Sequence, residues 1–259
     1  MRNNRTAESA ADTAQRIVLS DQSIGLVSVL NARELGGYMN TDGLRVKRGK
    51  LIRSGQLSDI IKADIDILTK KFDLGTIIDL RTLQEAAEMP DPKFGAVQYY
   101  NYPVTDENRT GSSVSGDTEL YYSLMCGLAA RNAYKHFFER LLTGSDNKAV
   151  LFHSAYGKDR AGVAAALLLV LLDIPEETVT EDYLLTNKAN AHTVRLGEEN
   201  VAVPAYYGGV QLPENVYAHS LEYAFAGVSV EYGSVRDYIK EIAGLSENDI
   251  KELKRKYLE

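Results

Sequence analysis

The sequence has few residues that could form disulfides or metal centres. Of its 259 residues only one is a cysteine, Cys126, which excludes an intrachain disulfide and a zinc site built from cysteines. The four histidines are widely spaced, which argues against a histidine-rich metal site: His136, His153, His192 and His219. We therefore expect chemistry that needs neither a metal ion nor another cofactor.

Long apolar runs are missing too. The longest, over residues 163–172, is too short to cross a bilayer and fits a buried helix. Residues 1–15 contain no apolar stretch and so do not resemble a signal peptide. We expect no integral membrane segment and a cytoplasmic location, with secretion left open if a leader has been removed.

Two common catalytic motifs are absent. No G-x-x-x-x-G-K-[ST] sequence occurs, because Gly157 and Lys158 are followed by Asp159, and this excludes a P-loop NTPase. No G-x-S-x-G sequence occurs, which argues against a serine hydrolase of that type. The net charge of −7 argues against a protein that binds nucleic acid through bulk positive charge.

The composition, 44% hydrophobic and 25% charged, is ordinary for a globular protein. We expect a flexible N-terminal segment over residues 1–15 and a single domain over residues 16–259. Residues 190–213 show no regular pattern and are expected to be a loop or lid insertion. No pattern specifies an oligomeric state.

Short runs that fit strands alternate with segments of helical spacing, and the run at residues 74–80 is rich in β-branched residues. We expect strands at residues 26–30, 74–80, 97–104 and 148–152, and helices at residues 58–71, 119–142, 161–172, 176–189 and 215–226. The tail, residues 234–258, is expected to form two helices, with Ser246 capping the second. This order predicts an α/β fold, in which helices flank a mostly parallel central sheet and further helices follow at the C-terminus.

The segment between the strand at 148–152 and the helix at 161–172 is the most informative. Backbone N–H groups and the positive end of the helix dipole would converge on this loop and favour an anion. Arg160 adds a planar fork suited to two phosphate oxygens, Lys158 adds a second positive charge, and Gly157 permits close backbone approach. We therefore expect the loop to bind a phosphate group through residues Ala155, Tyr156, Gly157, Lys158, Asp159 and Arg160.

This loop, HSAYGKDRAG, resembles the HCxxGKDRxG signature of the bacterial tyrosine-phosphatase-like family, which includes dual- and triple-specificity enzymes. Three further blocks resemble the family in the same order, NARELGGY (31–38), LIRSGQLS (51–58) and IIDLRTLQE (77–85), and residues 232–254 also look similar. The resemblance implies a tyrosine-phosphatase-like fold and cysteine-dependent hydrolysis of phosphomonoesters through a phosphocysteine. It implies phosphotyrosine proteins, phosphoinositides or inositol phosphates as substrates.

One residue departs from the family pattern. The nucleophile position holds Ser154, whose hydroxyl stays protonated at neutral pH, so we expect little or no turnover. Either an engineered Cys-to-Ser substitution traps the substrate, or the chain is a natural pseudophosphatase that binds phosphorylated ligands. The rest of the loop is intact, which favours the first explanation.

Three aspartates are candidates for the general acid. The resemblance implies Asp79, Asp159 belongs to the loop itself, and Asp106 follows Pro103 in a polar segment and ranks lower. The structural alternative for Asp79 is an ion pair with Arg81 or Arg53. For Asp159 it is the orientation of arginine or backbone groups.

Five other residues are candidates for contact with the substrate. Arg33, Arg53 and Arg81 lie in the matched blocks, and the resemblance suggests that some of them bind the phosphate or a second anionic group. The alternative for each is a structural salt bridge. His153 is expected to fix the loop by hydrogen bonding, and Tyr156 to contact the substrate or to pack as a ring.

Overall fold

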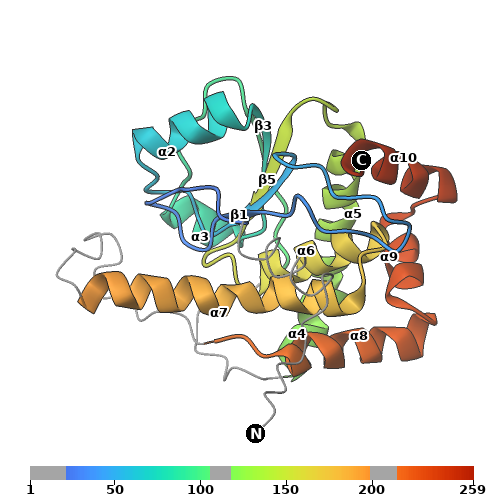
Figure 1. The fold of residues 1–259 in the computed structure, drawn as a ribbon. Coiled ribbons are helices and arrows are strands. Elements are labelled where there is room, and N and C mark those ends of the chain that lie inside the picture. The colour runs from blue at the N-terminus through green and yellow to red at the C-terminus, as the bar shows by residue number, and fades with distance from the viewer. Residues whose placement is uncertain (1–21, 106–117, 199–214) are drawn as a thin grey trace, which may run out of the picture.

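The computed structural model describes residues 22–105, 118–198 and 215–259 (Figure 1). The expected N-terminal segment at residues 1–15 lies outside the described residues. So does Asp106.

A five-stranded sheet forms the centre of the described structure, in the order β1-β2-β5-β3-β4. The strands are β1 (Arg33–Glu34), β2 (Leu51–Ser54), β3 (Leu74–Asp79), β4 (Gln98–Asn101) and β5 (Ala149–His153). Only β1 pairs antiparallel with its neighbour; the other three pairings are parallel. The predicted α/β fold with a mostly parallel central sheet is therefore confirmed.

Helices cover both faces of this sheet (Figure 1). Their bounds are α2 (Lys62–Asp66, continued by a π-helical turn at Ile67–Lys71), α3 (Leu83–Glu88), α4 (Thr118–Cys126), α5 (Leu128–Thr143), α6 (Arg160–Leu171), α7 (Glu176–Glu198), α8 (Ala218–Tyr232), α9 (Val235–Ala243) and α10 (Glu247–Tyr257). In β5, Val150 and Phe152 face the core that holds α5 and α6, while Ala149 and Leu151 face the smaller core beside α2. Alternate side chains thus bury both faces, as parallel sheets require.

Several expected elements are confirmed within a few residues. The strands at 74–80, 97–104 and 148–152 are present, as are the helix at 161–172 and the two C-terminal helices. Ser246 caps α10: its Oγ accepts a hydrogen bond from the backbone N–H of Asp249 at 3.2 Å.

Other expectations need correction. Residues 26–30 form no strand, because the N–H groups of Val27 and Ser28 bind the Asp64 carboxylate, at 3.0 and 2.8 Å. The helix expected from Ser58 begins at Lys62, since the Ser58 hydroxyl donates to the carbonyl of Met89 instead. The single helix expected over residues 119–142 is split into α4 and α5 at Gly127.

The segment expected to be a loop or lid insertion at residues 190–213 is helical in its first part, because α7 continues to Glu198. Residues 199–213 of that segment lie outside the described residues. In the part of the chain that the structure describes, no helix is both long and apolar enough to cross a bilayer.

Candidate active site

The sequence-predicted loop lies where three parallel strands end. Ser54 of β2 and Asp79 of β3 both pair with His153, the last residue of β5, and α6 begins at Arg160. The carboxyl ends of parallel strands are the usual location of ligand sites in α/β folds. Residues 154–159 therefore occupy the expected place for a binding loop.

Hydrogen bonds from segments packed behind the loop fix its backbone. The carbonyl of Ala155 accepts from the N–H of Gln56 at 3.1 Å, and the carbonyl of Gly157 accepts from Asn31 Nδ2 at 2.9 Å and from Arg53 Nη2 at 2.8 Å. The described peptide bonds are all trans, so each carbonyl points away from the N–H of the next residue. The N–H groups of Tyr156 and Lys158, which follow these carbonyls, consequently point the opposite way, to the side of the loop that faces away from these contacts.

Gly157 is required by this packing. Its φ is +65°, and a Cβ atom there would lie 2.5 Å from the backbone carbon of Ser54. Any other residue would push the loop off the end of β2.

Arg160 is held in a fixed orientation by Glu85, a residue to which the sequence analysis gave no role. Its Nη1 and Nη2 donate to the two carboxylate oxygens of Glu85 at 2.5 and 2.8 Å. Burial alone would raise the pKa of Glu85, but the hydrogen bonds and charge of Arg160 outweigh it and hold the pKa below its usual value. Glu85 uses two of the five guanidinium N–H donors, and among the described residues the other three have no hydrogen-bond partner, so they are available to a ligand.

One sequence pattern predicted a structural role for Glu85, that of a helix cap. Thr82 and Glu85 form a capping box at the start of α3, with the Thr82 N–H donating to Glu85 Oε2 at 2.8 Å. This spacing can be read from TLQE, but the contact with Arg160, 75 residues away, cannot.

Replacing Glu85 by glutamine should weaken the binding of inorganic phosphate about tenfold, or about 1.4 kcal/mol. Glutamine keeps the helix cap, but its amide NH₂ opposes one guanidinium N–H, so Arg160 loses its fixed plane. Titration calorimetry would measure the affinity. Glu88→Gln, the same change at an exposed position of α3, is the control. Unchanged or tighter phosphate binding by Glu85→Gln would show that Glu85 does not orient Arg160 for the ligand but only competes with the ligand for its guanidinium.

Asp159 lies at the end of the loop with its side chain 26% exposed. Its Oδ1 accepts a hydrogen bond from the hydroxyl of Tyr121, and its Oδ2 lies 3.6 Å from Lys158 Nζ. Tyr183 in turn donates to the hydroxyl of Tyr121. No sequence pattern pointed to either tyrosine.

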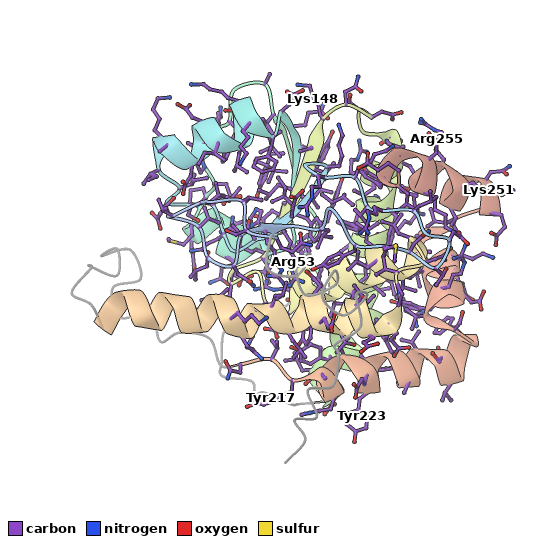
Figure 2. All side chains as sticks on the ribbon, viewed as in Figure 1. Arg53, Lys148, Tyr217, Tyr223, Lys251 and Arg255 are labelled. Carbon is purple, nitrogen blue, oxygen red and sulfur yellow. The ribbon has the colours of Figure 1, made fainter. Side chains whose placement is uncertain are left out.

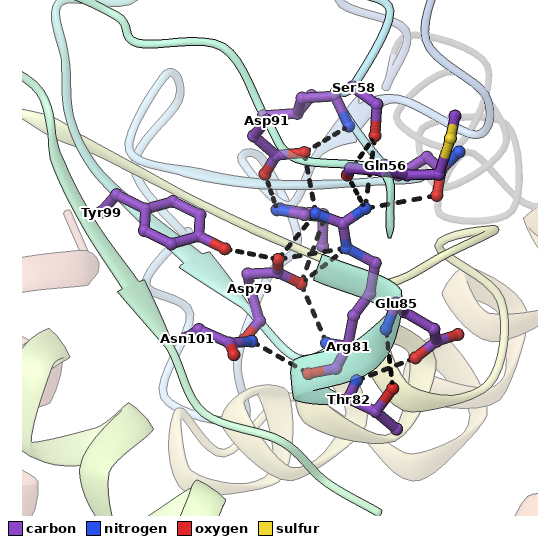
Figure 3. A network of polar contacts seen from close by, with 12 residues as sticks. Gln56, Ser58, Asp79, Arg81, Thr82, Glu85, Asp91, Tyr99 and Asn101 are labelled. Atoms are coloured by element: carbon purple, nitrogen blue, oxygen red, sulfur yellow. Dashed lines mark hydrogen bonds and ion pairs between the residues drawn. The ribbon is translucent and has the colours of Figure 1, made fainter. Parts of the chain in front are cut away.

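Asp79 has no exposed surface and belongs to a buried ionic network (Figure 3). Arg81 Nη2 lies 2.8 Å from Asp79 Oδ2 and 3.0 Å from Asp91 Oδ1, and the hydroxyl of Tyr99 donates to Asp79 Oδ2 at 2.7 Å. Burial would raise the pKa of Asp79, but His153 and the charge and hydrogen bonds of Arg81 hold the pKa below its usual value. The ion pair with Arg81, expected as the structural alternative, is present.

His153 lies in the same network. It is fully buried, with Nε2 2.8 Å from Asp91 Oδ2 and Nδ1 3.8 Å from Asp79 Oδ1. These three residues offer ligand atoms within 4.8 Å of one another. The guanidinium of Arg81 already bridges the carboxylates of Asp79 and Asp91, however, and supplies positive charge between them. The three residues therefore fit a network of ion pairs better than a metal centre.

Arg33 and Arg53 are placed behind the loop, where both bind Asp182 of α7. Arg33 Nε lies 3.1 Å from Asp182 Oδ1, Arg53 Nη1 lies 2.7 Å from Asp182 Oδ2, and the hydroxyl of Tyr38 donates to Oδ1 at 3.0 Å. Burial and the neighbouring Arg33 lower the pKa of Arg53 to about 10, which still leaves it charged at neutral pH. Figure 2 shows Arg53 in the interior, consistent with its complete burial. Both arginines thus make the salt bridges expected as alternatives.

The remaining candidates lie on the loop. Ser154 is 2% exposed and directly follows β5, and Lys158 is also buried, at 9%. The ring of Tyr156 is 38% exposed. The structure therefore brings Ser154, Lys158, Asp159 and Arg160 together at the end of β5.

The chain is similar to known proteins over most of its length. The model of the tyrosine phosphatase family matches residues 24–259. A protein of Cupriavidus necator that carries the name "putative tyrosine-protein phosphatase" is 28% identical over 244 residues, which cover 89% of this chain and 86% of that protein. A tyrosine-protein phosphatase of Nostoc commune is 27% identical over 223 residues, covering 78% and 72% of the two chains.

Proposed function

The chain belongs to the tyrosine phosphatase family, and from this premise we propose that residues 154–160 bind the phosphate of a phosphomonoester that Ser154 does not cleave. One observation carries the proposal. The carbonyls of Ala155 and Gly157 are bound from behind, so that the N–H groups of Tyr156 and Lys158 point to the other side of the loop, and Glu85 orients the guanidinium of Arg160 at the end of the same loop. N–H groups and a planar cation are the donors that phosphate oxygens require.

In this proposal Arg160 and the loop amides bind the phosphate oxygens and would stabilise the charge that develops in the transition state. Lys158 adds positive charge at the same place. Ser154 stands where the family has its cysteine, with a hydroxyl that is a poor nucleophile at neutral pH. The residues of the loop supply this charge without a metal ion.

We assign the general acid to Asp159 rather than to Asp79. Asp159 is partly exposed on the loop, where a leaving oxygen could reach it. Asp79 has no exposed surface, and its pKa is held down by the charged groups around it, so it is poorly suited to deliver a proton.

The proposed ligands are phosphotyrosine proteins and phosphoinositides or inositol phosphates. The exposed ring of Tyr156 beside the loop supports an aromatic phosphomonoester. The charge of Lys158 next to Arg160 supports ligands with more than one phosphate.

Titration of the unmodified chain with inorganic phosphate tests the proposal. We expect saturable binding that Arg160→Lys weakens at least about tenfold, because lysine cannot make the planar two-point contact. Arg255→Lys, at an exposed ion pair, is the control and should bind as the parent does. Phosphotyrosine peptide and inositol phosphates, titrated in parallel, would separate the ligand classes. Absence of phosphate binding by the parent chain would refute the proposal.

A further inference from the structure

Two successive hydrogen bonds between tyrosine hydroxyls and a carboxylate connect the interior to Asp159. Tyr183 of α7 donates to Tyr121 of α4, and Tyr121 donates to Oδ1 of Asp159. The two rings meet edge to face, with centroids 6.1 Å apart, and the residues are 1% and 4% exposed. Both helices that supply them lie outside the loop.

The number of protons on each hydroxyl decides which group donates and which accepts in these two hydrogen bonds. A tyrosine hydroxyl can donate one hydrogen bond. Tyr121 donates its hydrogen bond to the carboxylate of Asp159, so its oxygen lone pairs are left to accept the hydrogen bond of Tyr183. Burial and the carboxylate of Asp159 raise the pKa of Tyr121 far above its usual value, and burial likewise raises that of Tyr183. Both tyrosines therefore stay protonated and act as donors.

Packing fixes the inner tyrosine against α6. A Cβ atom added to Gly162 would lie 3.1 Å from two carbons of the Tyr183 ring. Gly162 therefore leaves the space that the ring occupies. The position of Asp159 is thus tied to α4, α6 and α7 as well as to its own loop.

We propose that Tyr121 is the positioning residue for Asp159, and that Tyr183 holds Tyr121 in place. Tyr121 fixes Oδ1, which leaves Oδ2, on the side of Lys158, as the oxygen that meets the phosphorylated ligand. This inference rests on the proposed function, because it assigns Asp159 the task of facing the ligand and protonating its leaving oxygen. It adds two residues from helices outside the loop to that site.

The first test uses the chain as it exists, with inorganic phosphate as the probe. Tyr121→Phe should weaken phosphate binding about threefold, because the carboxylate loses the donor that partly compensates its charge. The same substitution should have no effect when Asp159 is already replaced by asparagine. An equal loss in both backgrounds would overturn the inference, because Tyr121 would then act independently of Asp159.

The second test measures turnover in the Ser154→Cys background with two substrates. For phenyl phosphate, whose leaving group needs a proton, Tyr121→Phe should lower kcat about tenfold, with KM raised by no more than about threefold. For 4-nitrophenyl phosphate, whose leaving group is a good one, the loss should be below about threefold. Tyr183→Phe should act in the same direction but less. Equal losses on both substrates would mean a structural role only and would overturn the inference.

Tyr257→Phe is the matched control. Its hydroxyl is also buried but donates to the carbonyl of Leu141, in the last turn of α5, at 3.0 Å. It should change neither the phosphate affinity nor the dependence on the leaving group. If the parent chain fails to bind phosphate, the proposed function fails and the inference with it. If the parent binds phosphate and the Tyr121 and Asp159 effects are simply additive, only the inference fails.

Discussion

Replacing Ser154 by cysteine is expected to raise phosphate release from 4-nitrophenyl phosphate at least about a thousandfold over the parent chain. The loop that would activate the thiol is already in place. The backbone N–H groups of the loop, the start of α6 and the buried Lys158 all favour a thiolate at position 154 over a neutral thiol. A serine hydroxyl, with a far higher intrinsic pKa, gains too little from the same surroundings to ionise at neutral pH.

The two explanations of Ser154 give opposite results in this experiment. A substrate-trapping variant of an active enzyme would regain turnover, and the preferred substrate would then identify its subclass. A pseudophosphatase would show no turnover even as Ser154→Cys, although phosphate compounds would still raise its Tm. Ser154→Ala is the matched control, because it removes the hydroxyl without supplying a thiol. Turnover that disappears on treatment with a chelator would contradict a mechanism without metal.

Local sequence pattern was sufficient for the elements that surround the loop. Residues 148–172 combine a short apolar run with a long Ala- and Leu-rich one, and β5 and α6 formed where these runs predict them. The strand expected at residues 26–30 failed for a long-range reason, since the carboxylate of Asp64 binds the backbone there. No pattern within residues 26–30 could have revealed that contact.

The same limit applies to the candidate site. The loop and its resemblance predicted residues 154–160, but the residues that hold the loop are distant in sequence. From the sequence, Glu85 could be recognised only as part of a helix cap. Asp182 could be recognised only as a polar residue of a helix, because its partners Arg33 and Arg53 lie 149 and 129 residues away. Which of several arginines face a ligand and which are buried in ion pairs is decided by such contacts, so the sequence left both alternatives open.

Asp182→Asn is expected to lower the free energy of unfolding by about 3–5 kcal/mol at pH 7, measured by urea denaturation. The substitution keeps the size of the side chain but leaves Arg33 and Arg53, both buried, without their shared carboxylate. Asp146→Asn is the control: its ion pair with Arg255 is about half exposed, so the loss should stay below about 1 kcal/mol. Because Arg53 also holds the carbonyl of Gly157, we expect Asp182→Asn to weaken phosphate binding as well.

The dependence on pH distinguishes lost charge pairing from lost packing. Burial would raise the pKa of Asp182, but Arg33, Arg53 and the hydroxyl of Tyr38 outweigh it and hold the pKa below its usual value. A carboxyl with a lowered folded-state pKa contributes stability above its unfolded pKa of about 3.9, and that contribution is lost as the pH falls through the folded value. The stability curves of the parent and of Asp182→Asn should therefore converge on acidification below about pH 4. A difference that stayed constant down to the acid transition would show that Asp182 stabilises the fold by shape rather than by charge.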